Sequence, residues 1–157
     1  MAIIVEDGTG IANANSYAGA TEADTYFSDR AVSAWTGTQK EAALIRATAY
    51  LDAVYGLRAV GQPYPGNALA WPRLHAWDRY GVPLVGLPLA LKQACFEAAL
   101  LALSQDLLPP SERAAVVMRE RVGNVEREYS GGSAATTYQI VDRLMQPLLR
   151  CGARITR

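Results

Sequence analysis

The sequence predicts a small, mainly α-helical domain of about four helices, with a β-hairpin inserted before the last helix and a long ordered loop rich in Pro, Gly and Trp. Apolar residues recur at helical spacing in several segments. Gly123-Asn124 is a two-residue turn signal between strand-compatible runs. The chain has 157 residues, 50% of them hydrophobic, which suffices for one buried core. We therefore expect one domain over residues 1–149, followed by a basic C-terminal tail at 150–157.

The N-terminal part supplies two of the expected helices. Ala2–Val5 is a short apolar run compatible with an edge strand. Thr21 can cap a short helix whose first turn carries acids, which complement the helix dipole. Thr38 and Glu41 have the spacing of a capping box, and apolar residues repeat at helical spacing from there to Val54.

Residues 56–88 differ in composition from the rest of the chain. They contain five of the eight prolines and two of the three tryptophans. Long irregular segments are uncommon in compact domains and are either functional or disordered, and the aromatic content argues against disorder. We predict an ordered loop that Trp71, Arg73 and Trp77 anchor to the domain. Trp71-Pro72-Arg73 could instead be a platform on which bases stack. We favour the interpretation in which the tryptophans of this loop belong to a small satellite core.

The C-terminal part supplies the other two helices. Pro88 opens a strongly apolar helix that extends to about Asp106 and should be the most buried element. Gly131-Gly132-Ser133 is a hinge before the last helix. The apolar face of that helix is expected to consist of Ile140, Val141, Leu144, Met145 and Leu148.

Residues 116–129 are the predicted hairpin. Folding about Gly123-Asn124 places Val122 opposite Val125 and Met118 opposite Tyr129. Between them lie three successive pairs of opposite charge: Arg121–Glu126, Glu120–Arg127 and Arg119–Glu128. Charges occur on both faces, so the ribbon cannot lie flat on a core, and an isolated two-stranded ribbon is marginally stable. It is either a solvated surface hairpin or an element that projects from its domain, in which case these six residues form a subunit interface.

The charge distribution limits the function classes. The net charge is zero, which argues against sequence-independent nucleic-acid binding, because such proteins carry a basic excess. The first 29 residues hold five acids and no base, whereas the last eight hold three arginines and no acid. This asymmetry reflects either chance with solvated termini or head-to-tail assembly of unlike surfaces. Arginines make up 13 of the 15 basic residues, which suits interfaces but also follows from a GC-rich genome.

No segment has the pattern of a catalytic, metal or cofactor site. His75 is the single histidine and is interpreted as structural or solvated. Cys95 lies in an apolar helix and is interpreted as a buried thiol. Gly8-Thr9-Gly10 lacks the third glycine of a dinucleotide loop. The start lacks the charged region of a signal peptide, and no apolar stretch is long enough for a membrane span. We predict no enzyme and no cofactor.

Several motifs in the chain resemble, in order and spacing, a family of tailed-bacteriophage proteins. The motifs are Asn15-Ser16-Tyr17, 22–27 (EADTYF), 39–48 (QKEAALIRAT), 70–73 (AWPR) and 122–129 (VGNVEREY). The resemblance covers roughly residues 13–149. Members are described either as head–tail connector, or adaptor, proteins or as DnaT-like single-stranded-DNA-binding proteins.

The connector resemblance implies a structural virion protein. Such a protein forms a ring with neighbouring copies, typically a dodecamer, between the portal protein and the next neck or tail protein. DNA is then only the content of the channel that the ring continues, and no membrane is involved. In related connectors the C-terminal segment docks on the portal, which implies that role for Arg150, Arg154, Ile155 and Arg157. The implied location is the head–tail interface of the virion, and the host cytoplasm before assembly. The alternative description implies a protein that coats single-stranded DNA in replication.

Overall fold

The computed structural model describes residues 2–108, 119–122, 125–128 and 138–150. Its helices are α1 (Ala20–Ser28), α2 (Lys40–Tyr55), α3 (Leu89–Ala102) and α4 (Gln139–Met145), with short 3-10 helices η1 (Gly56–Arg58) and η2 (Gln146–Leu148). Its strands are β1 (Gln62–Pro63), β2 (Arg73–Leu74), β3 (Arg119–Val122) and β4 (Val125–Glu128). The predicted fold class, mainly α with a hairpin between the third and last helices, is confirmed.

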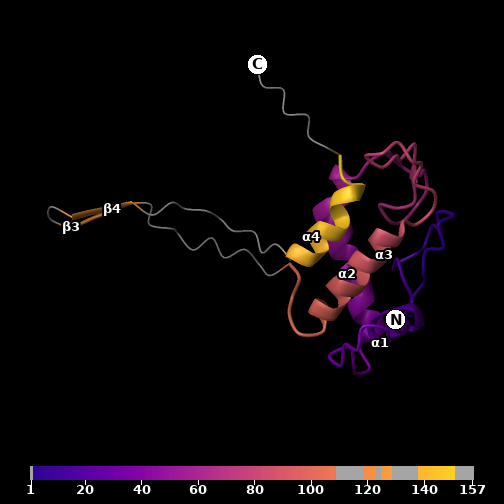
Figure 1. Cartoon of the computed structure of the whole chain (residues 1–157), viewed down its shortest axis with the longest axis horizontal. Helices are drawn as coiled ribbons and strands as arrows, with labels where there is room; N and C mark the ends of the chain where they lie inside the picture. Colours follow the sequence, from indigo (N-terminus) through magenta and orange to yellow (C-terminus); the bar gives the residue numbers. More distant parts are fainter. Residues whose placement is uncertain (1, 109–118, 123–124, 129–137, 151–157) are drawn as a thin grey trace, which may run out of the picture.

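Helix α3 is the central element of the bundle and packs on both α2 and α4 (Figure 1). It is the helix predicted to be most buried, although it ends at Ala102 rather than near Asp106. Alanines on the facing helices are fully buried and let the backbones of α2 and α3 approach closely. The buried residues of these two helices are Ala43, Leu44, Ala47, Thr48, Tyr50, Leu51 and Tyr55 of α2, and Leu91, Ala94, Cys95, Phe96, Ala98, Ala99 and Ala102 of α3.

The apolar face of α4 is narrower than the sequence predicts. Val141 and Met145 are buried, as is Leu148 of η2, but Ile140 is 50% exposed. A polar contact also ties α4 to α2, because the hydroxyl of Tyr55 donates a hydrogen bond to the carboxylate of Asp142. Burial raises the pKa of Tyr55, so the hydroxyl stays a donor at any physiological pH.

Polar contacts hold α1 across the lower end of the bundle in Figure 1. Glu22 pairs with Lys92 of α3, and Asp24 pairs with Lys40 of α2, each at 2.8 Å. The indole of Trp35 also donates to Asp24, at 2.8 Å. The hydrogen bond from Lys40 holds the pKa of Asp24 below its ordinary value. Partly exposed ion pairs contribute at most about 1 kcal/mol each, so they orient α1 more than they stabilise the fold.

Three local predictions are wrong. Gly19, not Thr21, is the N-cap of α1. Gln39 precedes α2 without a side-chain cap, so the capping box predicted to begin at Thr38 does not form. Ala2–Val5 makes a single parallel bridge instead of a strand. At α1 a local contact replaces the predicted cap, because the carboxylate of Glu22 accepts the amide of Gly19 at 3.2 Å.

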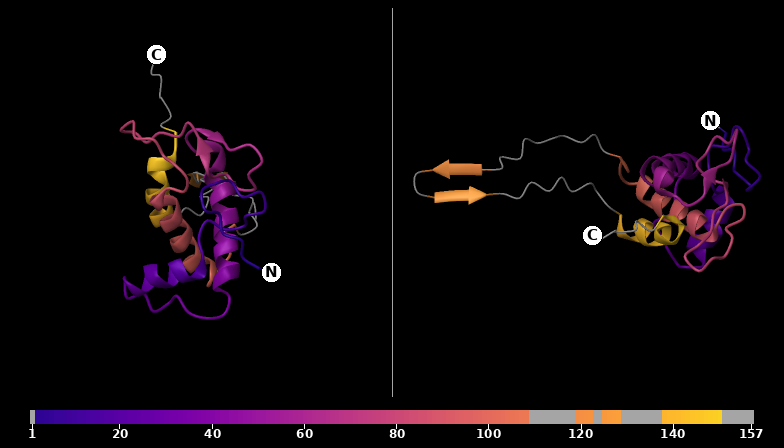
Figure 2. Two further views of the ribbon diagram at one scale, coloured as in Figure 1. Left: turned by 90° about the vertical axis from the view of Figure 1, so that its right-hand side faces the viewer. Right: turned by 90° about the horizontal axis from the view of Figure 1, so that it is seen from above.

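The register of the hairpin is as predicted. β3 and β4 are antiparallel and pair Arg119 with Glu128, Glu120 with Arg127, Arg121 with Glu126, and Val122 with Val125. The predicted pair Met118–Tyr129 and the turn at 123–124 lie outside the described residues. Figures 1 and 2 show β3 and β4 well apart from the helical bundle, and we call these two strands the arm.

The predicted loop between α2 and α3 covers the end of the bundle at which α2 and η2 finish (Figure 2). A bridge between Ala59 and Leu149, and a hydrogen bond of 3.0 Å from the amide of Val60 to the carbonyl of Leu148, join the loop to the C-terminal part of the chain. Of its two tryptophans, Trp71 is 1% exposed and Trp77 is 53% exposed. The loop is therefore ordered, as expected, but only one tryptophan anchors it.

Trp71→Ala should destabilise the protein by about 3–5 kcal/mol, since it leaves a large cavity in the core. Trp77→Ala, the matched control in the same loop, should change stability by less than about 1 kcal/mol. Urea denaturation followed by circular dichroism measures both. Equal losses for the two variants would contradict the assignment of Trp71 as the anchor.

Candidate binding surface at the loop end

A buried polar network holds the middle of the loop between α2 and α3. The hydroxyl of Tyr17 donates to the carboxylate of Asp52 on α2, and the same carboxylate accepts the amide of Ala70 at 3.0 Å. The amide of Trp71 donates to the Tyr17 hydroxyl oxygen at 3.2 Å. Burial raises the pKa of both Tyr17 and Asp52. Through this network the N-terminal segment and α2 together fix the backbone that carries Trp71.

Arg73 of β2 crosslinks the loop from inside. It is 7% exposed, and its guanidinium donates to the carbonyls of Gly56 and Ala70 at 3.2 Å and of Gly61 at 3.3 Å. Burial lowers the pKa of Arg73, and the neighbouring Arg150 lowers it further. No carboxylate within the described residues forms a salt bridge with it. Its role is therefore to satisfy three backbone carbonyls of an irregular segment.

Arg150 joins the C-terminal end of the described chain to the same point. Its side chain donates to the carbonyl of Ala59 at 3.2 Å and to that of Gly61 at 3.1 Å, and its amide donates to the carbonyl of Arg58 at 2.9 Å. The Gly61 carbonyl thus accepts from two arginines. Gly61 itself has φ +73°, and a Cβ at this position would lie 2.5 Å from the carbonyl oxygen of Leu74. Only glycine fits there.

A tight turn at residues 76–84 presents aromatic side chains to solvent. The amide of Leu84 donates to the carbonyl of Ala76 at 2.8 Å, and the amide of Asp78 donates to that of Val82 at 2.9 Å. The carboxylate of Asp78 in turn accepts the amides of Tyr80 and Val82, both at 2.8 Å. Tyr80 is 79% exposed. We call residues 76–84 the Trp77 turn.

Arginines accompany these aromatic side chains. The guanidinium of Arg79 lies 5.3 Å from the ring centroid of the exposed Tyr80, whereas that of Arg58 lies 5.3 Å from the ring of Tyr55, which is buried. Arg58, Arg79 and Arg150 are exposed, and none forms a salt bridge with another described residue. The nearby acid, Asp78, is engaged within its own turn. The result is a positively charged aromatic surface.

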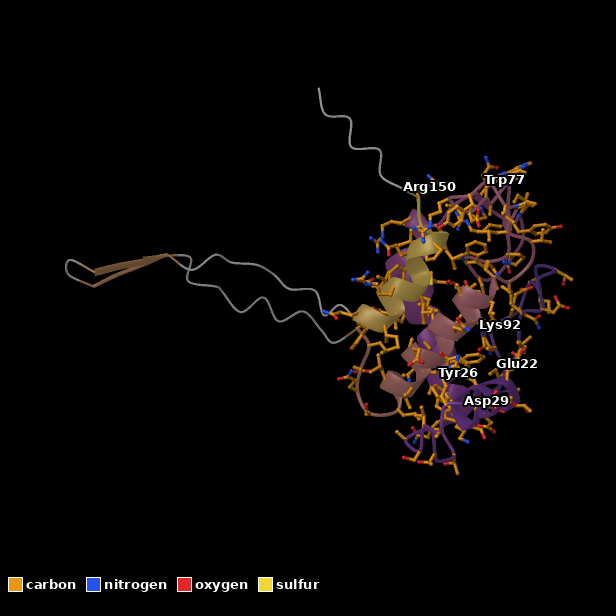
Figure 3. The ribbon with its side chains drawn as sticks, viewed as in Figure 1. Glu22, Tyr26, Asp29, Trp77, Lys92 and Arg150 are labelled. Carbon is orange, nitrogen blue, oxygen red and sulfur yellow. The ribbon has the colours of Figure 1, made fainter. Side chains whose placement is uncertain are left out.

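We call the exposed side chains of Leu57, Arg58, Trp77, Arg79, Tyr80, Val82 and Arg150 the loop-end surface. Figure 3 shows Trp77 and Arg150 at one end of the bundle and Glu22, Tyr26 and Asp29 toward the other. The charge asymmetry seen in the sequence is therefore also an asymmetry in space. Two N-terminal acids do not take part. The carboxylate of Glu6 is buried and accepts the amides of Gly8, Gly10 and Ile11, and the exposed Asp7 precedes Gly8, which packs against Gly86 of the loop.

The predicted site residues fall into three groups. Trp71 and Arg73 are buried anchors of the loop, as expected, so Trp71-Pro72-Arg73 is not an open stacking platform. The prediction that Trp77 is an anchor is wrong, because the turn directs it into solvent. The arm residues Arg119, Glu120, Arg121, Glu126, Arg127 and Glu128 pair as predicted, and Arg154, Ile155 and Arg157 lie outside the described residues.

Sequence reasoning missed Arg58, Arg79 and Tyr80 as members of a surface. The signal was present, since Tyr80 follows Arg79 directly beside a turn-forming Asp78. The sequence does not show the hydrogen bond from the amide of Arg150 to the carbonyl of Arg58, which brings these two residues together.

The described residues hold neither a metal-ligand cluster nor a reactive thiol. Among them no group of three His, Cys, Asp or Glu side chains is placed to hold a metal ion. No helix in this part of the chain has the length and apolar character needed to cross a membrane. Burial raises the pKa of the Cys95 thiol to about 12, so it is not a nucleophile in the folded protein.

The sequence model of one protein family matches residues 1–157, and the description of that family is "Putative DnaT-like ssDNA binding protein". The chain belongs to this family. No curated protein and no solved structure matches the chain.

Arg73→Lys should destabilise the protein by about 2–3 kcal/mol, because lysine keeps the charge but cannot satisfy three separated carbonyls in a buried site. Arg150→Lys, at the other donor to the Gly61 carbonyl, should cost no more than about 1 kcal/mol, because the side chain is exposed and water replaces it. Chemical denaturation gives both values. If the two variants lose equal stability, the carbonyl contacts of Arg73 are not what fixes the loop.

Proposed function

We propose that the chain is a structural component of the head–tail connector of a tailed bacteriophage. The observation that carries this proposal is the arm. Its strands pair in a register that puts three opposite-charge pairs side by side, and they lie apart from the bundle. A two-stranded ribbon is only marginally stable alone and presents unpaired backbone groups at its edges. An arm of this kind gains stability by lying against a neighbouring copy.

The polarity of the bundle supports the same proposal. The acids of α1, two of them paired with lysines, lie at one end of the bundle, and the arginines of the loop-end surface lie at the other; ends that differ in this way suit a heterologous contact, in which unlike surfaces of successive copies meet. Such contacts close into a ring when the rotation between copies allows it. The proposed partners are neighbouring copies, the portal protein and the next neck or tail protein. The proposed location is the head–tail interface of the virion, with DNA as the content of the channel and the basic segment from Arg150 onward as the portal-facing part.

The paired charges of the arm give a test with an internal rescue. Arg119→Glu with Arg121→Glu should place like charges opposite Glu128 and Glu126 and abolish assembly with co-expressed portal protein. Adding Glu126→Arg and Glu128→Arg restores opposite charges at the same positions and should restore assembly. Electron microscopy and sedimentation of the purified complexes provide the measurement. Normal rings from the first variant, or no rescue by the second, would remove the arm from the interface.

Single-stranded-DNA binding is the second candidate function. Two observations favour it: the description of the family that matches the whole chain, and the exposed arginines and aromatic rings of the loop-end surface. Arginine contacts with phosphates and stacking of bases on aromatic rings are the usual means of binding unpaired strands. Zero net charge requires that any such binding be local to one surface.

The dependence of binding on salt separates the two candidates. For strand binding through three arginines, the logarithm of the association constant for a fluorescent oligothymidylate should fall with the logarithm of salt concentration with a slope of roughly −2. Fluorescence anisotropy between low and physiological salt measures it. A connector that only encloses DNA should show weak binding at physiological salt. Tight, salt-sensitive binding by a protein that never joins the portal would reverse the order of the two candidates.

A further inference from the structure

We infer that the loop-end surface binds single-stranded nucleic acid, with Trp77 and Tyr80 stacking on bases and Arg58, Arg79 and Arg150 contacting phosphates. This inference rests on the second candidate function and assigns it to particular residues. It also moves the stacking site within the loop, away from the buried Trp71 and onto the Trp77 turn.

The aromatic side chains have the exposure that stacking requires. Among the described tryptophans, Trp35 and Trp71 are buried at 5% and 1% exposure, and only Trp77 offers its ring to solvent. Tyr80 lies on the same turn and is more exposed still. Burial of these rings in the core would be favourable, but the geometry of the turn keeps them in contact with solvent. Exposed rings become available for stacking on bases, each of which has an aromatic face.

The turn is ordered without a ligand. Three backbone hydrogen bonds lie within it, and the Asp78 carboxylate accepts the amides of Tyr80 and Val82 at its tip. Little conformational entropy is therefore lost when a strand binds, which favours affinity from a small surface.

The charge of the surface favours a polyanion. Of the three exposed arginines, Arg79 lies on the turn, Arg58 lies on η1, and Arg150 donates to the carbonyls of Ala59 and Gly61. The buried guanidinium of Arg73 also donates to the Gly61 carbonyl and adds a fourth positive charge. The ion pairs of the described residues, Glu22–Lys92 and Asp24–Lys40, lie instead at the α1 end. The exposed Leu57 and Val82 would also suit a protein partner. The excess of one charge sign and the guanidinium beside the Tyr80 ring favour nucleic acid.

Fluorescence of Trp77 reports directly on this surface. Titrating the full chain with oligothymidylate at low salt should quench tryptophan emission, since the two buried tryptophans are shielded. Arg58→Gln with Arg79→Gln should weaken binding at least tenfold. The matched control, Arg30→Gln with Arg143→Gln, removes the same charge from exposed positions elsewhere and should change affinity less than twofold. Tyr80→Ala should also weaken binding, and circular dichroism should show unchanged helicity in every variant.

The possible results separate the inference from the function on which it rests. If oligothymidylate binds but both double variants lose affinity equally, the surface is wrongly assigned while strand binding stands. If no oligothymidylate binds at low salt, the inference and the strand-binding function on which it rests are both overturned. If Arg58→Gln with Arg79→Gln changes sedimentation of the protein but not strand binding, the surface contacts another protein copy and the inference is overturned.

Discussion

The buried guanidinium of Arg73 is the contact on which the shape of this end of the molecule depends. An irregular segment of more than thirty residues carries many backbone carbonyls, and a packed domain cannot bury them without donors. Arg73 satisfies three of them at once and brings Gly56, Gly61 and Ala70 to a common point. Arg150 also donates to the Gly61 carbonyl and so joins the C-terminal end of the described chain to that point. With this center fixed, Trp71 faces the core and the Trp77 turn faces solvent.

The molecule divides its tasks between separate elements. The bundle of α2, α3 and α4 supplies stability through buried apolar side chains, and α1 is oriented by polar contacts at one end. The side chains of the loop-end surface are exposed, and the arm lies apart from the bundle (Figure 1). The assembly role of the arm and the strand-binding role of the loop end use different parts of the structure, whereas Arg150 belongs both to the loop-end surface and to the segment proposed to face the portal.

The accuracy of the sequence-based expectations follows from the range of the interactions involved. The hairpin register followed from one turn signal and from alternation of charge, because both are local. The helices followed from apolar spacing, because a helix in a small domain buries one stripe. The cap at Thr21 and the box at Thr38 failed: Glu22 reaches back to the Gly19 amide at the start of α1, and no side chain caps α2 at Gln39.

The sequence by itself determined the helices and the pairing of the arm, since these depend on neighbours close in the chain. Tertiary structure alone decided which tryptophan is buried. Trp71 and Trp77 stand six residues apart in the same loop with similar surroundings in sequence. Their different exposure results from Arg73 and from the Tyr17–Asp52 network, whose partners lie far apart in the chain. Long-range contacts of this kind leave no periodic pattern, so the loop-end surface became visible only in the folded molecule.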